Sequence, residues 1–213
     1  MSSLLSPVPT PSPDQVRRYL ARWRVGDNEK IDAALKIAFA AMPKNDDVGQ
    51  VGVKIAALNG LYSTNIFAVV QVARHIVSLD IDAALAGDVM DPALVERIAN
   101  VEIRGKRRRN YSFATKYCNF HRPDVYPIYD SLVVGILNSL LKQGEKFDTF
   151  TRGEHWGTDY AIWHRSIRRF CEHYGLGEFS IREIDKYLWT LAKERRAKPA
   201  GPTPTIEGAP TAT

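Results

Sequence analysis

Cysteine is scarce in this sequence of 213 residues, which contains only Cys118 and Cys171. Two cysteines are too few for a four-cysteine zinc or iron–sulfur site, and they argue against a disulfide-stapled scaffold. Long apolar runs are also missing, because no segment approaches the roughly 20 residues that a membrane-spanning helix needs. The opening stretch, MSSLLSPVPTPSP, is broken by prolines and lacks a secretory apolar region. We therefore expect a cytoplasmic protein with no membrane partner.

Signals for metal and phosphate sites are missing as well. His155, His164 and His173 do not have the i, i+4 spacing of helical metal ligands, and no glycine-rich phosphate loop is present. We therefore expect no metal and no cofactor. Strand signals are nearly absent, and only VYPIY (residues 125–129) reads as extended, because Pro127 disfavours helical backbone in the residue before it.

Helical periodicity fills the chain between two compositionally biased ends. Residues 1–12 are rich in proline and serine, and residues 197–213 are rich in proline and threonine, so we expect both segments to be disordered. Residues 13–196 then form one helical domain. The pattern predicts an all-α fold, a compact bundle of about eight to ten short helices.

Several helix starts carry recognisable capping signals. Ser12 followed by Pro13 predicts the start of the first helix, and Ser180 with Glu183 forms a capping box at the start of the last. The apolar stretch STNIFAVVQVARHIVSL, residues 63–79, predicts another helix, with a serine or threonine able to cap it.

Positive charge is concentrated in one place, although the net charge is only +5. Five cations occupy six consecutive positions: Arg104, Lys106, Arg107, Arg108 and Arg109. A second cluster at helical spacing consists of Arg165, Arg168 and Arg169. Clustered cations favour a polyanionic partner such as nucleic acid, and a solvated loop is the alternative.

Asp130 stands between the extended stretch YPIY and the apolar helix SLVVGIL. The sequence predicts that it caps that helix, which would also give the carboxylate a fixed direction for stabilising positive charge. Ser112 and Lys116 are four residues apart and share one helix face that could point toward Asp130. Lys116 is either an amine nucleophile with a lowered pKa or an ordinary surface lysine.

Polar and aromatic residues interleave in two further stretches. The first is the aromatic run around Tyr117 and His121, which suits stacking on a base and is also compatible with ordinary core packing. The second is the elbow between two apolar helices, where a turn explains Asn59 but does not call for Tyr62, Thr64 and Asn65 as well.

These stretches resemble landmarks of the helix-hairpin-helix DNA glycosylases. YPIYDSLVVGIL resembles the segment of that family in which an aspartate follows a proline-containing stretch and starts an apolar helix. Members that also nick the strand carry a lysine upstream; its position falls on Ser112 here, and Lys116 lies one turn later. LYSTNIFAVVQVARHI is similar to the family's wedge region, with Tyr62 and Asn65 at the polar positions. Residues 50–195 are similar to bacterial proteins related to 8-oxoguanine DNA glycosylases.

The resemblance implies a helix-hairpin-helix glycosylase-like fold that acts as a monomer on duplex DNA with a modified base. It places the family's hairpin at VEIRGKRRRN, with one glycine, so that the cations would hold phosphates. Asp130, Lys116 and Ser112 would be catalytic, with Asp130 stabilising an oxocarbenium-like transition state. The base pocket would contain Asn59, Tyr117 and His121.

Two other functions remain open on the sequence alone. One is a nucleic-acid-binding module of the same fold without catalysis, and the other is a helical interaction protein in a phage-defence setting.

Overall fold

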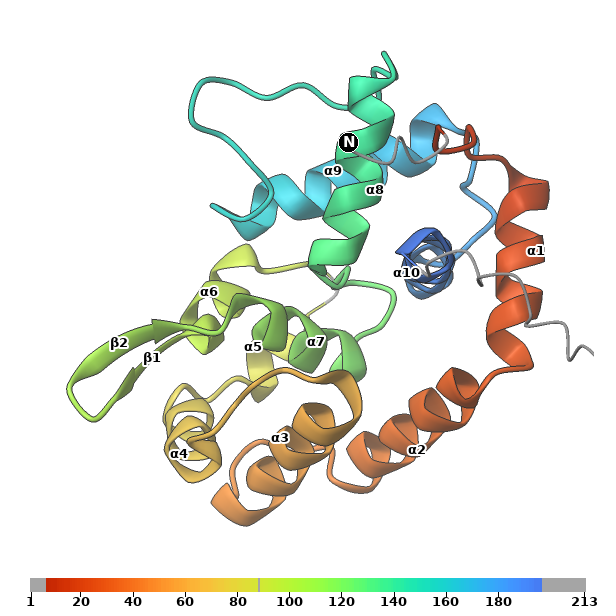
Figure 1. Ribbon diagram of the computed structural model, residues 1–213. Coiled ribbons are helices and arrows are strands. Elements are labelled where there is room, and N and C mark those ends of the chain that lie inside the picture. Colours follow the sequence, from red (N-terminus) through yellow and green to blue (C-terminus); the bar gives the residue numbers. More distant parts are fainter. Residues whose placement is uncertain (1–6, 88, 197–213) are drawn as a thin grey trace, which may run out of the picture.

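The computed structural model describes residues 7–87 and 89–196, whose arrangement is shown in Figure 1. Ten helices and one two-stranded sheet occur within those ranges. The helices are α1 (Pro13–Arg24), α2 (Asp27–Ala41), α3 (Val48–Tyr62), α4 (Val69–Ser78), α5 (Asp82–Ala86), α6 (Pro92–Ala99), α7 (Tyr111–His121), α8 (Ser131–Lys142), α9 (Tyr160–His173) and α10 (Ile181–Arg196). The strands are β1 (Asn100–Ile103) and β2 (Lys106–Arg109). The predicted helical class is confirmed for these residues, none of whose helices is long and apolar enough to cross a membrane.

The first and last helices begin with the capping chemistry that the sequence predicts. The side chain of Ser12 accepts a hydrogen bond from the N–H of Gln15 at 3.3 Å, just ahead of Pro13. The carboxylate of Glu183 accepts from the N–H and the hydroxyl of Ser180 at 2.9 and 3.1 Å. Both devices satisfy polar groups that a helix leaves without partners at its N-terminal end.

Residues 7–12 lie against the helical body. Val8 is buried, and its N–H and C=O exchange hydrogen bonds with the side-chain amide of Gln143 at 2.7 and 2.8 Å. The disorder predicted for residues 1–12 therefore does not hold for this part, because a distant amide satisfies its backbone. Residues 1–6 and the predicted disordered tail, residues 197–213, lie outside the described residues.

The core is organised around α7, which packs against α2, α3 and α6. Phe113, Ala114, Tyr117 and Cys118 of this helix are essentially inaccessible to solvent. The last helix, α10, returns to pack against α1 and α8, so that both ends of the described chain meet (Figure 1). A polar side chain on α7 is consequently surrounded by other elements and needs partners there.

The cationic stretch forms a β-hairpin, which projects from the helices at the side of α4 and α6 in Figure 1. The strands pair antiparallel from Asn100 opposite Arg109 to Ile103 opposite Lys106. Arg104 and Gly105 form the turn with positive φ angles of 52° and 71°, which suits the right-handed twist of a two-residue hairpin. The expectation of almost no strand missed this hairpin, because every residue of β2 is exposed and the strand shows no apolar alternation.

The helix predicted for residues 63–79 begins later than expected. α4 starts at Val69, and residues 63–68 form a loop instead. Ser63 and Asn65 have φ angles of 49° and 59°, in the left-handed region that no α-helix can include. The polar residues at this position therefore serve a loop rather than a helix cap.

Candidate active site

A cavity of about 580 Å³ lies between the loop after α3, the middle of α7, the start of α8 and one side of α10. Five of the predicted site residues line it: Tyr62, Asn65, Ser112, Lys116 and Asp130. The fold thus brings the predicted catalytic residues and the predicted wedge residues to one place.

Asp130 is the N-cap of α8, as predicted, and its two oxygens face different partners. Oδ1 accepts a hydrogen bond from the N–H of Leu132 at 2.8 Å, and Oδ2 lies 3.5 Å from Nζ of Lys116. The side chain is only 19% exposed. The positive end of the helix dipole favours negative charge at this position. The carboxylate is consequently fixed in direction and available to the cavity through Oδ2.

Lys116 is a buried lysine whose side chain is 5% exposed. Its Nζ donates a hydrogen bond to Oγ of Ser112 at 2.6 Å. Burial lowers the pKa of Lys116 below the ordinary lysine value, while the nearby Asp130 opposes this shift by favouring the charged form. A lysine with a lowered pKa gives up its proton more readily and can then act as an amine nucleophile. This burial rules out the alternative that Lys116 is an ordinary surface lysine.

Ser112 links Lys116 to the segment that carries Asp130. Its Oγ accepts from Lys116 and donates to the carbonyl oxygen of Tyr129 at 3.1 Å. One turn further on α7, Oγ1 of Thr115 accepts from the N–H of Tyr129, also at 3.1 Å. Two hydroxyls of α7 therefore hold the residue immediately before Asp130, and Ser112 contacts both Lys116 and this residue.

Asp185 of α10 is a second carboxylate in the cavity lining, and it was not among the predicted site residues. Its Oδ2 accepts a hydrogen bond from Arg182 at 2.9 Å. Burial raises the pKa of Asp185 to about 6, although Arg182 opposes the shift. One feature of the sequence could have indicated Asp185: this aspartate lies between Ile184 and Leu188, two apolar residues of the same helix that face the core.

Replacing Asp185 with Asn is expected to change how stability depends on pH. Between the pKa of about 3.9 of an unfolded aspartate and the folded value, the folded protein keeps a proton that the unfolded chain has lost. The free energy of unfolding of the wild type should therefore fall by about 2–3 kcal/mol, relative to Asp185→Asn, as pH rises from 4 to 7. Urea unfolding at several pH values measures this difference. Asp14→Asn, at an exposed carboxylate, is the control, and parallel curves for Asp185→Asn would contradict the prediction.

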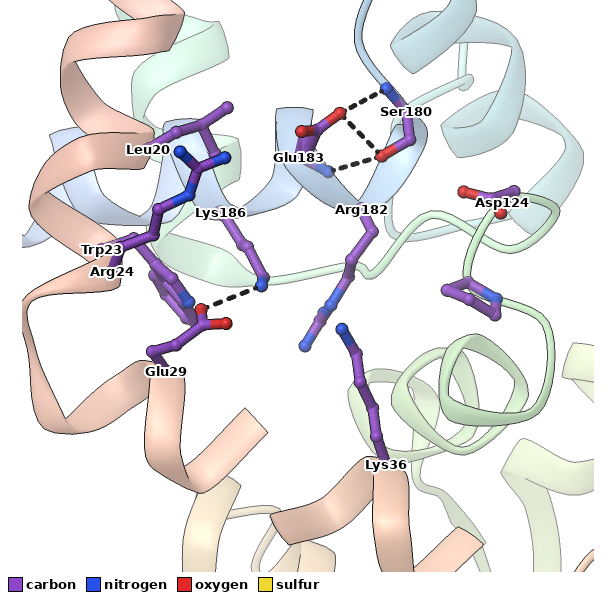
Figure 2. Close-up of a pocket in the computed structure, with 11 residues that line it drawn as sticks. Leu20, Trp23, Arg24, Glu29, Lys36, Asp124, Ser180, Arg182, Glu183 and Lys186 are labelled. Atoms are coloured by element: carbon purple, nitrogen blue, oxygen red, sulfur yellow. Dashed lines mark hydrogen bonds and ion pairs between the residues drawn. The ribbon is translucent and has the colours of Figure 1, made fainter. Parts of the chain in front are cut away.

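A cluster of ion pairs joins α2 to α10, the helix that carries Asp185. Asp32 of α2 is fully buried, accepts a hydrogen bond from Arg182, and lies 2.9 Å from Nζ of Lys186 and 3.2 Å from Nζ of Lys36. Burial alone would raise the pKa of Asp32, but Arg182 and Lys186 hold it below its ordinary value. Figure 2 shows Arg182 and Lys36 pointing toward one another from α10 and α2, in a second cavity of about 490 Å³. These three cations therefore compensate buried negative charge.

The same cluster fixes Tyr62, the residue predicted to be part of the wedge. The hydroxyl of Tyr62 donates to Asp32 at 3.3 Å and accepts from Arg182 at 2.8 Å. Its ring packs edge-on against Phe120 at a centroid distance of 5.5 Å. Tyr62 therefore forms a fixed part of the cavity wall, and swinging into a duplex would break these contacts.

The three predicted base-pocket residues are absent from the lining of the cavity. Tyr117 is fully buried and donates a hydrogen bond to Oδ1 of Asn45 at 2.5 Å. His121 lies with Nε2 3.4 Å from Nζ of Lys54, and burial lowers its pKa to about 3, assisted by that lysine. Tyr117 and His121 therefore belong to the core between α3 and α7, which was the alternative reading of the aromatic run.

Asn59, the third of these residues, holds the loop of residues 63–68. Its Oδ1 accepts from the N–H of Ile66 at 2.8 Å and from the hydroxyl of Thr64 at 3.3 Å. Its Nδ2 donates to the carbonyl oxygen of Ile66 at 3.2 Å. Ile66 itself is buried, so the amide and the core together fix the loop.

Most of the hairpin cations have no protein partner. Within the described residues, no hydrogen bond or ion pair engages the side chain of Arg104, Lys106, Arg107 or Arg108, and all four residues are exposed. Arg109 differs, because it pairs with Glu96 at 2.8 Å and lies over the ring of Tyr111 at 4.1 Å. Arg109 is therefore a structural residue at the base of the hairpin.

The second predicted cation cluster is largely neutralised. Arg169 lies 2.8 Å from Oδ1 of the buried Asp148, and Arg165 lies 3.9 Å from the same oxygen and 3.6 Å from Glu154. These arginines compensate acidic residues of the segment before α9. The hairpin therefore carries more cationic side chains without protein partners than this cluster does.

Comparison with known proteins gives two matches. The family model HI_0787_N, an N-terminal domain, matches residues 15–125. An uncharacterized protein of Haemophilus influenzae is 41% identical over 139 residues, which amount to 64% of this chain and 63% of the length of that protein. No solved structure was found to match the chain. Because the family match covers more than half of the 213 residues, the chain belongs to the HI_0787_N family.

Proposed function

We propose that this protein is a DNA N-glycosylase that turns a modified or damaged base out of a duplex and releases it. The observation that carries this proposal is the pairing of Asp130 with the buried Lys116 in one cavity, with Oδ2 and Nζ 3.5 Å apart. A fixed carboxylate can stabilise the oxocarbenium-like sugar that forms as a base leaves. A buried amine beside it can attack the same sugar carbon.

The reaction uses these groups in turn. The bond between C1′ and the base nitrogen breaks, and its electron pair leaves with the base, which takes up a proton. Asp130 stabilises the positive charge left on the sugar. Lys116, as a neutral amine, forms a bond from Nζ to C1′. The bond between C1′ and O4′ then breaks, O4′ takes up a proton lost from Nζ, and the opened sugar is left as a Schiff base. Loss of a proton from C2′ then expels the 3′ phosphate and nicks the strand.

The dimensions and walls of the cavity are compatible with a flipped base. Its volume of about 580 Å³ falls within the usual range of small-ligand pockets. Tyr62, Tyr129 and Trp189 contribute aromatic surface to the lining, and such surface stacks on an extruded base. The four unpaired hairpin cations supply contacts for phosphates, which help to offset the cost of extrusion.

Replacing Lys116 with Gln is expected to separate base release from strand nicking. The glutamine retains a donor for Ser112 but cannot form a Schiff base. Labelled duplexes carrying 8-oxoguanine, uracil, alkylated bases or hypermodified cytosines would be incubated with each protein, with and without hot alkali. The wild type should nick its substrate without alkali and become covalently attached to it when borohydride reduces the Schiff base. Lys116→Gln should show neither the nick nor the adduct.

Lys142→Ala is the matched control, because this exposed lysine at the end of α8 is not among the residues lining the cavity. Cleavage by the wild type only after alkali would mean that water completes the reaction and that Lys116 only supports Asp130. The glycosylase proposal fails if the wild type releases no base from any of these duplexes.

A second function is favoured by one specific observation. The four unpaired cations of the hairpin would bind DNA whether or not a base is released. A nucleic-acid-binding module without catalysis is therefore the alternative. It predicts salt-sensitive DNA binding by the wild type together with no base release.

A further inference from the structure

Phe67 is the most exposed large apolar side chain among the described residues, at 92% of its surface. It follows the buried Ile66, whose backbone N–H and C=O are both bonded to the side chain of Asn59. With Ile66 fixed in the core, the next side chain faces outward. The loop therefore presents the Phe67 ring to solvent on a backbone that the side chain of Asn59 holds in place.

The surroundings of Phe67 are strongly cationic. Phe67, Ala68, Gln71, Ile103, Arg104, Lys106 and Arg108 line a hollow of about 420 Å³ between the start of α4 and the hairpin; we call this surface the hairpin face. Lys106 and Arg108 are two positions apart on β2, so their side chains point to the same face of the hairpin. Ile103 lies opposite Lys106 on β1 and therefore faces the same way. The three cations in this lining are among those without a protein partner.

The hairpin face adjoins the candidate active site. Asn65 lines the 580 Å³ cavity and also lines a smaller hollow of about 390 Å³ that contains Phe67 and Arg108. The loop of residues 63–68 thus has the cavity on one side and the hairpin face on the other. A strand that passes over Asn65 would meet both.

We infer that the hairpin face binds a DNA strand by stacking one of its bases on Phe67 while Arg104, Lys106 and Arg108 bind the flanking phosphates. This inference rests on the proposed function, and it names a contact outside the cavity. Charge complementarity selects the occupant, because an apolar protein partner would leave three cations unpaired. An aromatic ring beside a cationic ribbon matches both the flat faces of bases and their phosphates.

The test is the affinity of the full chain for a labelled duplex that contains one unpaired nucleotide, measured by fluorescence anisotropy over a range of salt concentrations. Phe67→Ala should weaken binding by about tenfold, and Phe67→Trp should restore it, because stacking tolerates any aromatic ring. Phe67→Ala should leave the salt dependence unchanged. Arg108→Gln should instead reduce the slope of log K against log salt by about 0.9.

Val25→Ala is the matched control. This valine is 87% exposed and directly follows α1, a helix drawn on the opposite side of Figure 1 from the hairpin. The inference is overturned if Phe67→Ala binds within about twofold of the wild type, if Val25→Ala loses as much affinity, or if the wild type binds no DNA.

The outcome for this inference is separable from that for the proposed function. Weaker binding by Phe67→Ala, in a protein that releases no base, would retain the inference and reject the glycosylase. Base release by the wild type, together with unchanged DNA binding by Phe67→Ala, would retain the glycosylase and reject the inference.

Discussion

Asp130→Asn is expected to reduce base release by about a hundredfold to a thousandfold, the usual cost of losing one preorganised group that stabilises transition-state charge. Asparagine is nearly isosteric and lacks the negative charge that would face the sugar. DNA binding should persist, because the unpaired cations lie on the hairpin. Single-turnover base release and anisotropy titration measure the two quantities on the same duplex.

The fold should tolerate this change, which makes its effect on activity interpretable. Aspartate and asparagine are about equally good N-caps, so the bond from the N–H of Leu132 can be retained. Asp159→Asn is the matched control. Asp159 caps α9 in the same way, with the N–H of Ala161 donating at 2.7 Å, and it is not among the residues that line the 580 Å³ cavity. Equal losses in both variants would show that helix capping, and not the charge of Asp130, sets the rate.

Arg182→Met is expected to destabilise the protein by about 3–5 kcal/mol, because it removes one partner from a buried ion cluster. Asp32 would keep its buried charge while losing the guanidinium that bonds to it. Asp185 and Tyr62 would each lose a hydrogen bond from the same group. Urea unfolding at neutral pH measures the difference.

Arg17→Met is the control for this prediction. Arg17 also forms ion pairs, with Asp14 and Glu178, but its side chain is 54% exposed. Water screens such pairs, so little change in the unfolding midpoint is expected. If Arg182→Met unfolds at the same urea concentration as Arg17→Met, the buried cluster does not hold α10 to α2 as described.

Local signals in the sequence were sufficient for several helix starts and for part of the site. The caps at Ser12, Asp130 and Ser180 depend on neighbours within three residues, and the structure has all of them. The four-residue spacing of Ser112 and Lys116 likewise placed both on one face of α7, where they bond to each other. These features follow from the geometry of a single helix start or helix turn.

Features that depend on distant contacts were not predictable in this way. β2 is a strand because it pairs with β1, whose Val101 is buried, and its own residues show no strand pattern. Phe67 lies in the apolar run IFAVV, which predicts a core position on sequence alone. Its exposure depends on the hydrogen bond from the N–H of Ile66 to the side chain of Asn59. Asp185 becomes part of the cavity only because α10 returns to α8.

The pairing of Arg182 with Asp32 also has a consequence for the order of folding. The two residues are 150 positions apart, and Arg182 is 120 positions from Tyr62. Closing so long a loop costs entropy before its contacts contribute, so we expect these contacts to form late. During synthesis α7 and α8 can bring Lys116 and Asp130 together well before α10 exists. The wall that carries Asp185 is added last, so a chain that ends before α10 has Lys116 and Asp130 without this wall of the cavity.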